Sequence, residues 1–291
     1  MTRPGGTCRA IVLAAQRQGS VNPLAQRFGV SHKCLVPLAG RPLIAHVLHT
    51  LAAHPGLSEI IVSIEPEAFT ALQLALEPVA AHQAPIRLIP AAANLTDSVL
   101  AATQGHDGPV LITTADHALL SLQSIDHMLT ALADHDGALA MAPQRAVLAA
   151  HAEGQRRFYQ FRDGGYSNCN LYGLAGPTAL RAADIFRGGG QFARKTSRVI
   201  EAFGLVNLIL LRLRVVSLAE GLRRVSRRLG VNIAPVILSD GSQAIDVDND
   251  RTYAAVSQLL GAPPRQGAFR PPRHCNPTFR REILERGISA E

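Results

Sequence analysis

Three groups of charged side chains in this sequence have the types and spacing that suit chemistry on phosphate groups. Lys33 lies in a long polar stretch, Asp116 directly follows the apolar run VLIT, and Asp246, Asp248 and Asp250 lie together in IDVDND. Carboxylates hold Mg²⁺, and a lysine ammonium is a compact point charge for phosphate oxygens. The sequence therefore indicates a site that neutralises phosphate charge.

The elements around Lys33 are those of a ligand-binding βα unit. Residues 10–15 (AIVLAA) form an apolar run that predicts a buried strand. A polar loop with few apolar residues follows as far as Gly40, and an apolar stripe over 41–54, with Pro42 in its first turn, predicts a helix. Loops at the carboxyl ends of parallel strands bind ligands in open α/β sheets, so we expect the site there.

The remaining chain continues this alternation. Its pattern predicts an α/β fold with a doubly wound, mostly parallel sheet of the Rossmann type. Strands are predicted at 59–64, 86–90, 110–120 (ending in a charged turn), 138–143, 231–238 and 244–249, with a hairpin at 158–176. Helices are predicted at 66–80, 94–105, 124–137, 177–187, 198–231 and 250–260, and a loop or insertion at 144–155.

The predicted domain organisation is simple. Residues 1–261 are expected to form one domain with two halves, 1–135 and 136–261. Residues 262–291 are rich in proline and arginine and are expected to form an extended or surface-docked tail.

Composition favours a protein of the reducing cytoplasm with anionic partners. The chain of 291 residues has a formal net charge of +7, almost all of it from arginine, since Lys33 and Lys195 are the only lysines. The four cysteines show no CxxC spacing and no signal peptide is evident, so we expect reduced thiols and no zinc site. The basic charge suits nucleotides, acidic lipids or nucleic acid without choosing among them.

The segment around Lys33 also resembles a known family. The residues LAA (13–15), Lys33 with CLVPLAGRPLI behind it, and HVL resemble the N-terminal signature of nucleotidyltransferases, which include molybdenum-cofactor guanylyltransferases and the cytidylyltransferases of isoprenoid and polyol metabolism. That signature has two glycines where Gln16 and Gln18 stand here. Glycine lets a backbone approach a triphosphate closely, so the geometry of triphosphate binding is expected to differ.

The resemblance implies a nucleotide-binding half at 1–135, an acceptor-binding half at 136–261, and roles for particular residues. Lys33 and Asp116 would be catalytic; Asp116, Asp248 and then Asp246 would hold Mg²⁺, while Asp250 caps a helix and His117 is a neighbour of the site. The alternatives are a turn-forming, helix-capping role for Asp116 and a structural role for the aspartate cluster. Nucleotide-binding positions would be Leu13, Ala14, Ala15, Gln16, Arg17, Gly19, Lys33, Asn94, Asp97 and Ser98, with Arg27 as a further candidate.

Two of these segments have simpler readings as well. TDSV (96–99) resembles the base-contacting segment of cytidylyltransferases, and is equally explained as a helix N-cap. DGGYSNCN (163–170) offers acceptor-binding candidates at Gly165, Tyr166, Asn168 and Asn170, and is equally explained as a polar hairpin turn.

The region 198–231 combines apolar residues with many arginines. This pattern suits peripheral contact with an anionic membrane, and an amphipathic helix that covers the sheet would need the same residues. Its apolar run 205–211 is too short to span a bilayer, which takes about 20 residues.

Together these features predict a Mg²⁺-dependent nucleotidyltransferase. It would transfer an NMP unit from an NTP, with CTP or GTP favoured, to a small phosphorylated acceptor (a sugar, polyol or cofactor phosphate) and release pyrophosphate. A metal-dependent glycosyltransferase of the same fold, called GT-A, would leave the Lys33 segment unexplained. A non-catalytic nucleotide- or membrane-binding relative is favoured by the altered glycines and opposed by the retained lysine and aspartates. Nucleic-acid binding ranks last, because no aromatic stacking platform is present; dimerisation stays open.

Overall fold

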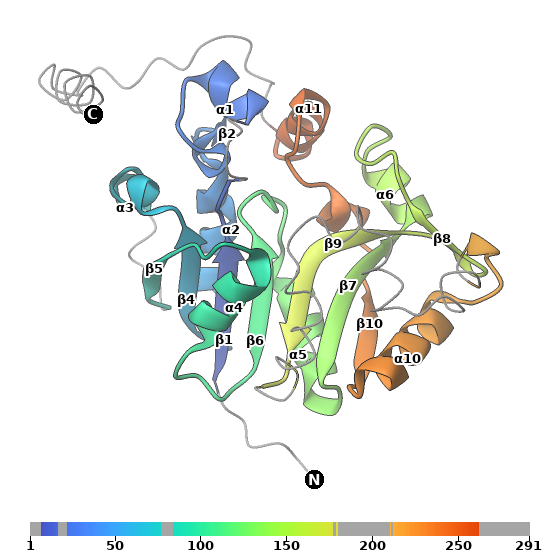
Figure 1. Ribbon diagram of the computed structural model, residues 1–291. Helices are drawn as coiled ribbons and strands as arrows, with labels where there is room; N and C mark the ends of the chain where they lie inside the picture. The colour runs from blue at the N-terminus through green and yellow to red at the C-terminus, as the bar shows by residue number, and fades with distance from the viewer. Residues whose placement is uncertain are drawn as a thin grey trace, which may run out of the picture.

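One mixed sheet forms the centre of the molecule in the computed structural model, which describes residues 7–16, 22–76, 84–176, 179, 210 and 212–261 (Figure 1). The strand order is β10-β7-β9-β6-β1-β4-β5, with β8 paired to β9. The strands are β1 (Cys8–Leu13), β4 (Leu57–Ile64), β5 (Ile86–Pro90), β6 (Val110–Thr114), β7 (Gly137–Pro143), β8 (Tyr159–Phe161), β9 (Gly164–Leu174) and β10 (Ile233–Ile237).

The sheet is mostly parallel, which confirms the predicted fold class. β1 pairs in parallel with β4 and β6, β4 with β5, and β10 with β7. β9 is antiparallel to both β6 and β7, and β8 is antiparallel to β9. Because β6, β1 and β4 run the same way, the loops that follow them meet at one edge of the sheet.

Helices cover both faces of the sheet. The larger core contains α2 (Leu43–Ala52), α3 (Phe69–Leu76) and α5 (Leu122–Asp134) on one face, and α4 (Leu95–Thr103) packs on the other. α10 (Leu218–Leu229) lies beside β10, and α11 (Asp250–Leu259) lies with α1 (Pro23–Phe28) above the end of β1 (Figure 1). None of the helices in the described ranges is long and apolar enough to cross a bilayer.

The α2 helix contributes much of the larger core, because its apolar stripe has Leu48 and Leu51 fully buried. Leu48→Ala should lower the free energy of unfolding by about 2–5 kcal/mol, the usual cost of a buried leucine truncation. Leu74→Ala in α3 is the matched control, because Leu74 is 53% exposed. Chemical denaturation of the two variants checks this, and equal midpoints would contradict it.

The polar stretch before Gly40 is more ordered than predicted. Its described part contains α1 (Pro23–Phe28), the short 3₁₀ helix η1 (Lys33–Leu35) and the strand β2 (Pro37–Leu38), which pairs with β3 (Arg41–Pro42) just beyond Gly40. Asn22 caps α1 through the Leu24 N–H, and Gly29 ends it in the left-handed conformation. Three apolar side chains of α1 are buried, which was enough to order it: Leu24, Ala25 and Phe28.

Two other local predictions were wrong. The predicted loop at 144–155 begins with a helix, α6 (Gln144–Ala150), which packs on the 3₁₀ helix η5 (Gly241–Ala244). The predicted strand at 244–249 is the end of η5 followed by non-strand chain, so Asp246 and Asp248 do not alternate along a strand. In that segment tertiary contacts outweigh a local strand pattern.

Some predictions fall outside the described residues. These are the tail 262–291, the helix at 177–187 and most of the helix at 198–231, of which α10 is described. Strands from both predicted halves, 1–135 and 136–261, lie in the one sheet. The boundary between the halves stays a prediction.

Candidate active site

Lys33 joins two of the predicted aspartates. Its Nζ lies 2.5 Å from Asp116 Oδ2 and 2.6 Å from Asp248 Oδ1. These residues come from three distant parts of the chain: η1, the loop after β6, and the turn before α11. The structure therefore brings together three charged residues that the sequence singled out.

Each charge in this group shifts the pKa of its neighbours. Burial alone would raise the pKa of Asp116, but the charge of Lys33 and the hydrogen bonds from Lys33 and Thr114 outweigh it and lower that pKa. Burial acts to lower the pKa of Lys33, and the two carboxylates raise it above its ordinary value. Lys33 is thus a cation, and Asp116 an anion, at neutral pH.

Asp246 has a different environment from Asp248. Asp246 is buried, and burial, followed by the neighbouring charges of Asp116 and Asp248, raises its pKa well above the usual range. Asn170 Nδ2 donates to Asp246 Oδ2 at 2.6 Å, while Asp246 Oδ1 has no hydrogen-bond partner among the described residues. Asp248 is 64% exposed, so the two carboxylates do not share one face, as side chains two residues apart in the predicted strand at 244–249 would.

Backbone and side-chain bonds connect the two aspartate segments. The Val247 N–H donates to the Asp116 carbonyl at 3.1 Å. Gln243 in η5 donates to the Leu119 carbonyl at 2.6 Å and accepts from the Ser124 hydroxyl at 2.9 Å. η5 is thereby fixed to the loop between β6 and α5, which carries Asp116.

His117 is a buried neighbour of the group, as expected. Its Nδ1 lies 3.1 Å from Thr113 Oγ1, and burial lowers its pKa to about 4. The imidazole is therefore neutral at pH 7, and it adds no positive charge beside Asp116.

A cavity of about 670 Å³ opens beside Lys33, within the size range of small-molecule sites. Of the predicted nucleotide-binding residues, Leu13, Ala14, Ala15, Gln16 and Lys33 line it. Arg17 and Gly19 lie outside the described residues. Sequence reasoning missed several lining residues, which carry no charge that would signal a site: Asn22, Pro23, Cys34, Leu43, Leu95, Thr114 and Ala115.

The residues predicted to contact the nucleotide base lie at the start of α4. Asn94 caps α4 through the Asp97 N–H, and its Nδ2 donates to Asp97 Oδ2 at 2.6 Å. Ser98 is buried and accepts from the Ala92 N–H at 2.9 Å. Their contacts are those of an N-cap, and the neighbouring Leu95 is the α4 residue that lines the cavity beside Lys33.

The acceptor-binding prediction divides into two parts along β9. Asn168 and Asn170 belong to the network of Asp246, and Asn170 takes a positive φ of 47° at an irregularity of the strand. Gly165 and Tyr166 lie in the β8–β9 hairpin, where the Tyr166 hydroxyl donates to Asp163 at 3.3 Å. Asn168 and Asn170 therefore lie at the aspartate group. The contact of Tyr166 is instead within the hairpin.

Arg27 is tied to α11 in the structure. Its guanidinium contacts Asp250 Oδ1 at 2.5 Å and lies over the rings of Phe28 and Tyr253. Asn249, with Asp250 beside it in the first turn, is the residue that caps α11. The predicted cap was therefore wrong by one position.

The oxygen atoms present fit a hard divalent cation. Asp116 and Asp248 direct carboxylate oxygens at one point, and Asp246 Oδ1 is buried without a partner. In the described ranges no group of three or more His, Cys, Asp or Glu is arranged to hold a metal by itself. Mg²⁺ is commonly held by one or two carboxylates together with substrate phosphates, so this set suits Mg²⁺ and not a protein-only cage.

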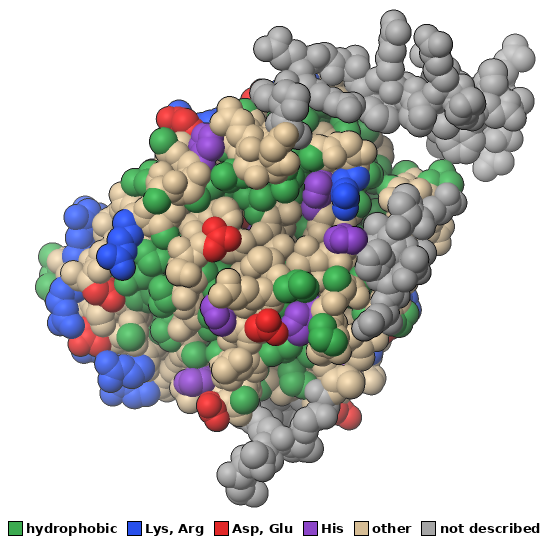
Figure 2. Space-filling model, turned by 180° about the vertical axis from the view of Figure 1, so that it is seen from behind, with side chains coloured by type: hydrophobic (Ala, Val, Ile, Leu, Met, Phe, Trp, Pro, Cys, Tyr) green, Lys and Arg blue, Asp and Glu red, His purple; other side chains and the backbone are tan. Residues whose placement is uncertain are grey.

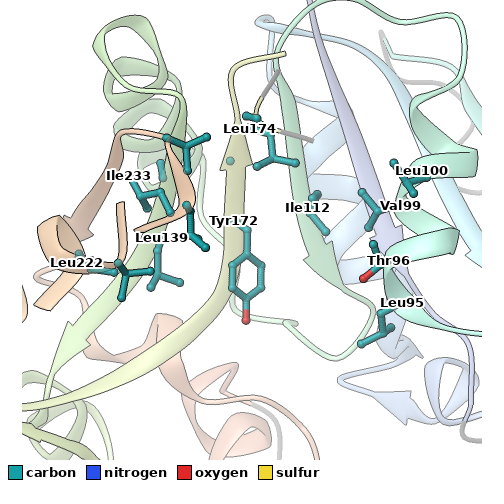
Figure 3. A pocket seen from close by; sticks show the side chains of 17 residues that line it. Leu95, Thr96, Val99, Leu100, Ile112, Leu139, Tyr172, Leu174, Leu222 and Ile233 are labelled. Atoms are coloured by element: carbon teal, nitrogen blue, oxygen red, sulfur yellow. The ribbon is translucent and has the colours of Figure 1, made fainter. Parts of the chain in front are cut away.

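A separate apolar groove of about 450 Å³ lies on the sheet face between α4 and α10 (Figure 3). Figure 3 shows the Tyr172 ring in its middle, flanked by Ile112 and Leu139 from neighbouring strands. The Tyr172 hydroxyl lies within hydrogen-bond distance of Asn168 Nδ2 and Asn170 Oδ1. This side chain therefore joins the groove to the Asp246 network, and Leu95 lines both the groove and the cavity beside Lys33.

The arginines of α10 lie away from that groove. The apolar side chains Leu222, Val225 and Leu229 line it, while Arg223, Arg227 and Arg228 are exposed. In Figure 2, basic side chains gather along the flank on which α10 lies in this orientation. Because the apolar residues of α10 line the groove, a membrane contact of α10 would rest on its arginines alone. Peripheral membrane binding stays a prediction.

Comparison with known proteins defines the class. Residues 10–232 match the model of the MobA-like NTP transferase domain, and the chain belongs to this family. It therefore carries a nucleotidyltransferase domain, whose substrate class is a nucleoside triphosphate. None of the curated proteins matches the chain.

Solved structures agree with this assignment. A hypothetical transferase from Thermus thermophilus is 27% identical with a TM-score of 0.69, over 84% of this chain and 98% of that one. The 4-diphosphocytidyl-2C-methyl-D-erythritol synthase of Anaerococcus prevotii is 12% identical with a TM-score of 0.56, over 88% and 97%. A CMP:2-keto-3-deoxy-manno-octonic acid synthetase complexed with CTP is 15% identical with a TM-score of 0.53, over 88% and 99%. The last two likenesses concern the fold alone.

Proposed function

We propose that this protein is a Mg²⁺-dependent nucleotidyltransferase that transfers an NMP unit from CTP or GTP to a small phosphorylated acceptor and releases pyrophosphate. The observation that carries the proposal is the convergence of Lys33, Asp116 and Asp248 at one point of the cavity. A cation between two carboxylates, beside a cavity at the ends of β1 and β6, is suited to a charged phosphate chain.

Charge stabilisation is the main task of such a site. The acceptor phosphate attacks the α-phosphorus in line, and negative charge moves onto the leaving pyrophosphate. Lys33 would bind phosphate oxygens there, and Asp116 and Asp248 would hold Mg²⁺, which supplies further charge neutralisation when bound. Asn168 and Asn170, with Asp246 behind them, would orient the acceptor through neutral hydrogen-bonding groups.

Lys33 must change partners for this role. Its ammonium contacts both carboxylates in the structure, so the arrival of metal and triphosphate would replace these contacts with phosphate oxygens. Little proton transfer by side chains is needed, because a phosphate nucleophile is already ionised at neutral pH.

Pyrophosphate release tests the proposal. The protein is incubated with Mg²⁺, each of the four NTPs in turn, and a pool of sugar, polyol and alditol phosphates. Release that requires CTP or GTP and an acceptor supports it, and EDTA should abolish that release. Release of a nucleoside diphosphate from a nucleotide sugar, with no pyrophosphate formed from any NTP, would identify the glycosyltransferase instead. Magnesium-dependent nucleotide binding without release from any mixture would favour the non-catalytic relative.

A further inference from the structure

A second network of contacts surrounds Gln16, at the end of β1. The Gln16 backbone N–H donates to Glu65 Oε1 at 2.7 Å, and its side-chain Nε2 donates to the Ser31 carbonyl at 2.9 Å. Ser31 Oγ lies 2.9 Å from His32 Nδ1, and His32 Nε2 lies 3.5 Å from Glu65 Oε2. The contacts form a closed ring of Gln16, Ser31, His32 and Glu65, which we call the tether.

The tether joins three segments that are distant in sequence. Gln16 follows β1, Glu65 follows β4, and Ser31 and His32 come directly before Lys33. His32 is also the N-cap residue of η1, the helix of Lys33, and it is buried. The position of the Lys33 backbone is therefore fixed from the ends of two sheet strands.

Gln16 supplies a link that glycine could not. The family signature has glycine at this position, and glycine has no side chain to reach the Ser31 carbonyl. Gln16 also lines the cavity beside Lys33. The departure from the signature thus adds a contact between the β1 end and the lysine segment.

We propose that Gln16 and Glu65 are positioning residues, which hold the Lys33 segment so that its ammonium meets the triphosphate. The role rests on the proposed function, because Lys33 is assigned to phosphate there. Glu65 is central, since it accepts from the Gln16 N–H and also faces His32. A shift of about 1 Å in such a group costs an enzyme on the order of a hundredfold in rate, so a modest loosening is measurable.

Two polar atoms in the tether strengthen the argument. Gln16 Oε1 is buried and has no hydrogen-bond partner among the described residues, and buried Glu65 Oε2 has the 3.5 Å contact with His32 Nε2 but no hydrogen bond there. Leaving buried acceptors without donors is unfavourable. We infer that this cost is accepted because Gln16 and Glu65 must lie where they hold the Lys33 segment. Glu65→Gln keeps an acceptor for the Gln16 N–H and brings a donor, so it is the conservative variant.

Amine labelling of Lys33 gives a readout that does not depend on activity. The chain has two lysines, Lys33 and Lys195, so the ratio of their acetylation by acetic anhydride can be read from peptide masses in one sample. Lys33 is 19% exposed and paired with two carboxylates, so it should react slowly in the wild type. A protonated, buried amine is protected from acetylation, so loosening the Lys33 segment should expose it. Glu65→Ala and Gln16→Gly should therefore raise the Lys33-to-Lys195 acetylation ratio roughly fivefold, and Glu65→Gln should leave that ratio within about twofold of wild type.

Kinetics provide the second readout. In the pyrophosphate assay, Glu65→Ala should lower kcat/KM for the NTP roughly tenfold and leave KM for the acceptor unchanged. Glu65→Gln should restore it. Glu67→Ala, an exposed glutamate of the same turn, is the matched control and should behave as wild type in both assays.

The outcomes separate this inference from the function on which it rests. Faster Lys33 labelling in a protein that never releases pyrophosphate would support the tether and refute the proposed reaction. Wild-type labelling in folded Glu65→Ala and Gln16→Gly would overturn the tether, whatever the activity. If Glu65→Ala does not fold, Gln16→Gly alone decides, because it removes only the side-chain bond to Ser31.

Discussion

Asp116→Asn should reduce pyrophosphate release by about 10³-fold or more, the range found when a group that stabilises transition-state charge is removed. Asp116 is the less exposed carboxylate of the pair that holds Lys33, and it is fixed by Thr114 and by Lys33 itself. Asparagine keeps the shape but loses the charge that would hold Mg²⁺ and orient the ammonium. Initial rates at saturating NTP and acceptor measure the loss.

A matched control separates this effect from a change in folding. Asp134→Asn replaces an exposed aspartate at the end of α5 and should leave both rate and melting temperature unchanged. Circular dichroism should show Asp116→Asn folded, since the Lys33–Asp248 contact remains. A rate within tenfold of wild type would remove Asp116 from the catalytic group and leave it the role of a turn residue.

The main site could be predicted because its residues are marked by type and by place. Asp116 follows a strand that is apolar enough to be recognised, and Lys33 is one of two lysines in an arginine-rich chain. The ends of parallel strands meet at one edge, so the sequence pattern places both residues there. Their contact in the structure confirms that they lie together; their chemical roles stay proposals.

The surroundings of Asp246 could not be predicted in the same way. A strand pattern at 244–249 implied one shared face, but the chain there is held by the Val247 N–H on the Asp116 carbonyl and by Gln243. These bonds span more than a hundred residues of sequence. They bury Asp246 and leave Asp248 exposed. The local sequence pattern does not predict this difference in exposure.

The tether was missed for a related reason. The family signature marks Gln16 only as the loss of a glycine, because a signature shows which residue is missing and not which contact the new one makes. Its partners Ser31 and Glu65 are polar residues in loops, without a pattern of their own. Similarly, the β9 strand was recognised within a hairpin, but its insertion between β6 and β7 depends on pairings that sequence alone does not specify.

Gly241→Ala should lower the free energy of unfolding by about 4 kcal/mol or more, in the range of severe core disruption. Gly241 begins η5, and a Cβ there would overlap the backbone of Ala146 and Val147 in α6. Because the obstacle is backbone and not a flexible side chain, α6 and η5 would have to separate. Chemical denaturation measures the loss.

The same substitution should disturb the site, which gives it a second test. η5 carries Gln243 and leads directly to Asp246 and Asp248, so its displacement moves the carboxylates that contact Lys33 and Asn170. Gly221→Ala in α10 is the control of opposite sign: its Cβ would have only ordinary contact with Phe161, and alanine in a helix should stabilise by roughly 0.5–1 kcal/mol. Were Gly241→Ala as stable and as active as wild type, the contact of α6 with η5 would not be what places the aspartates.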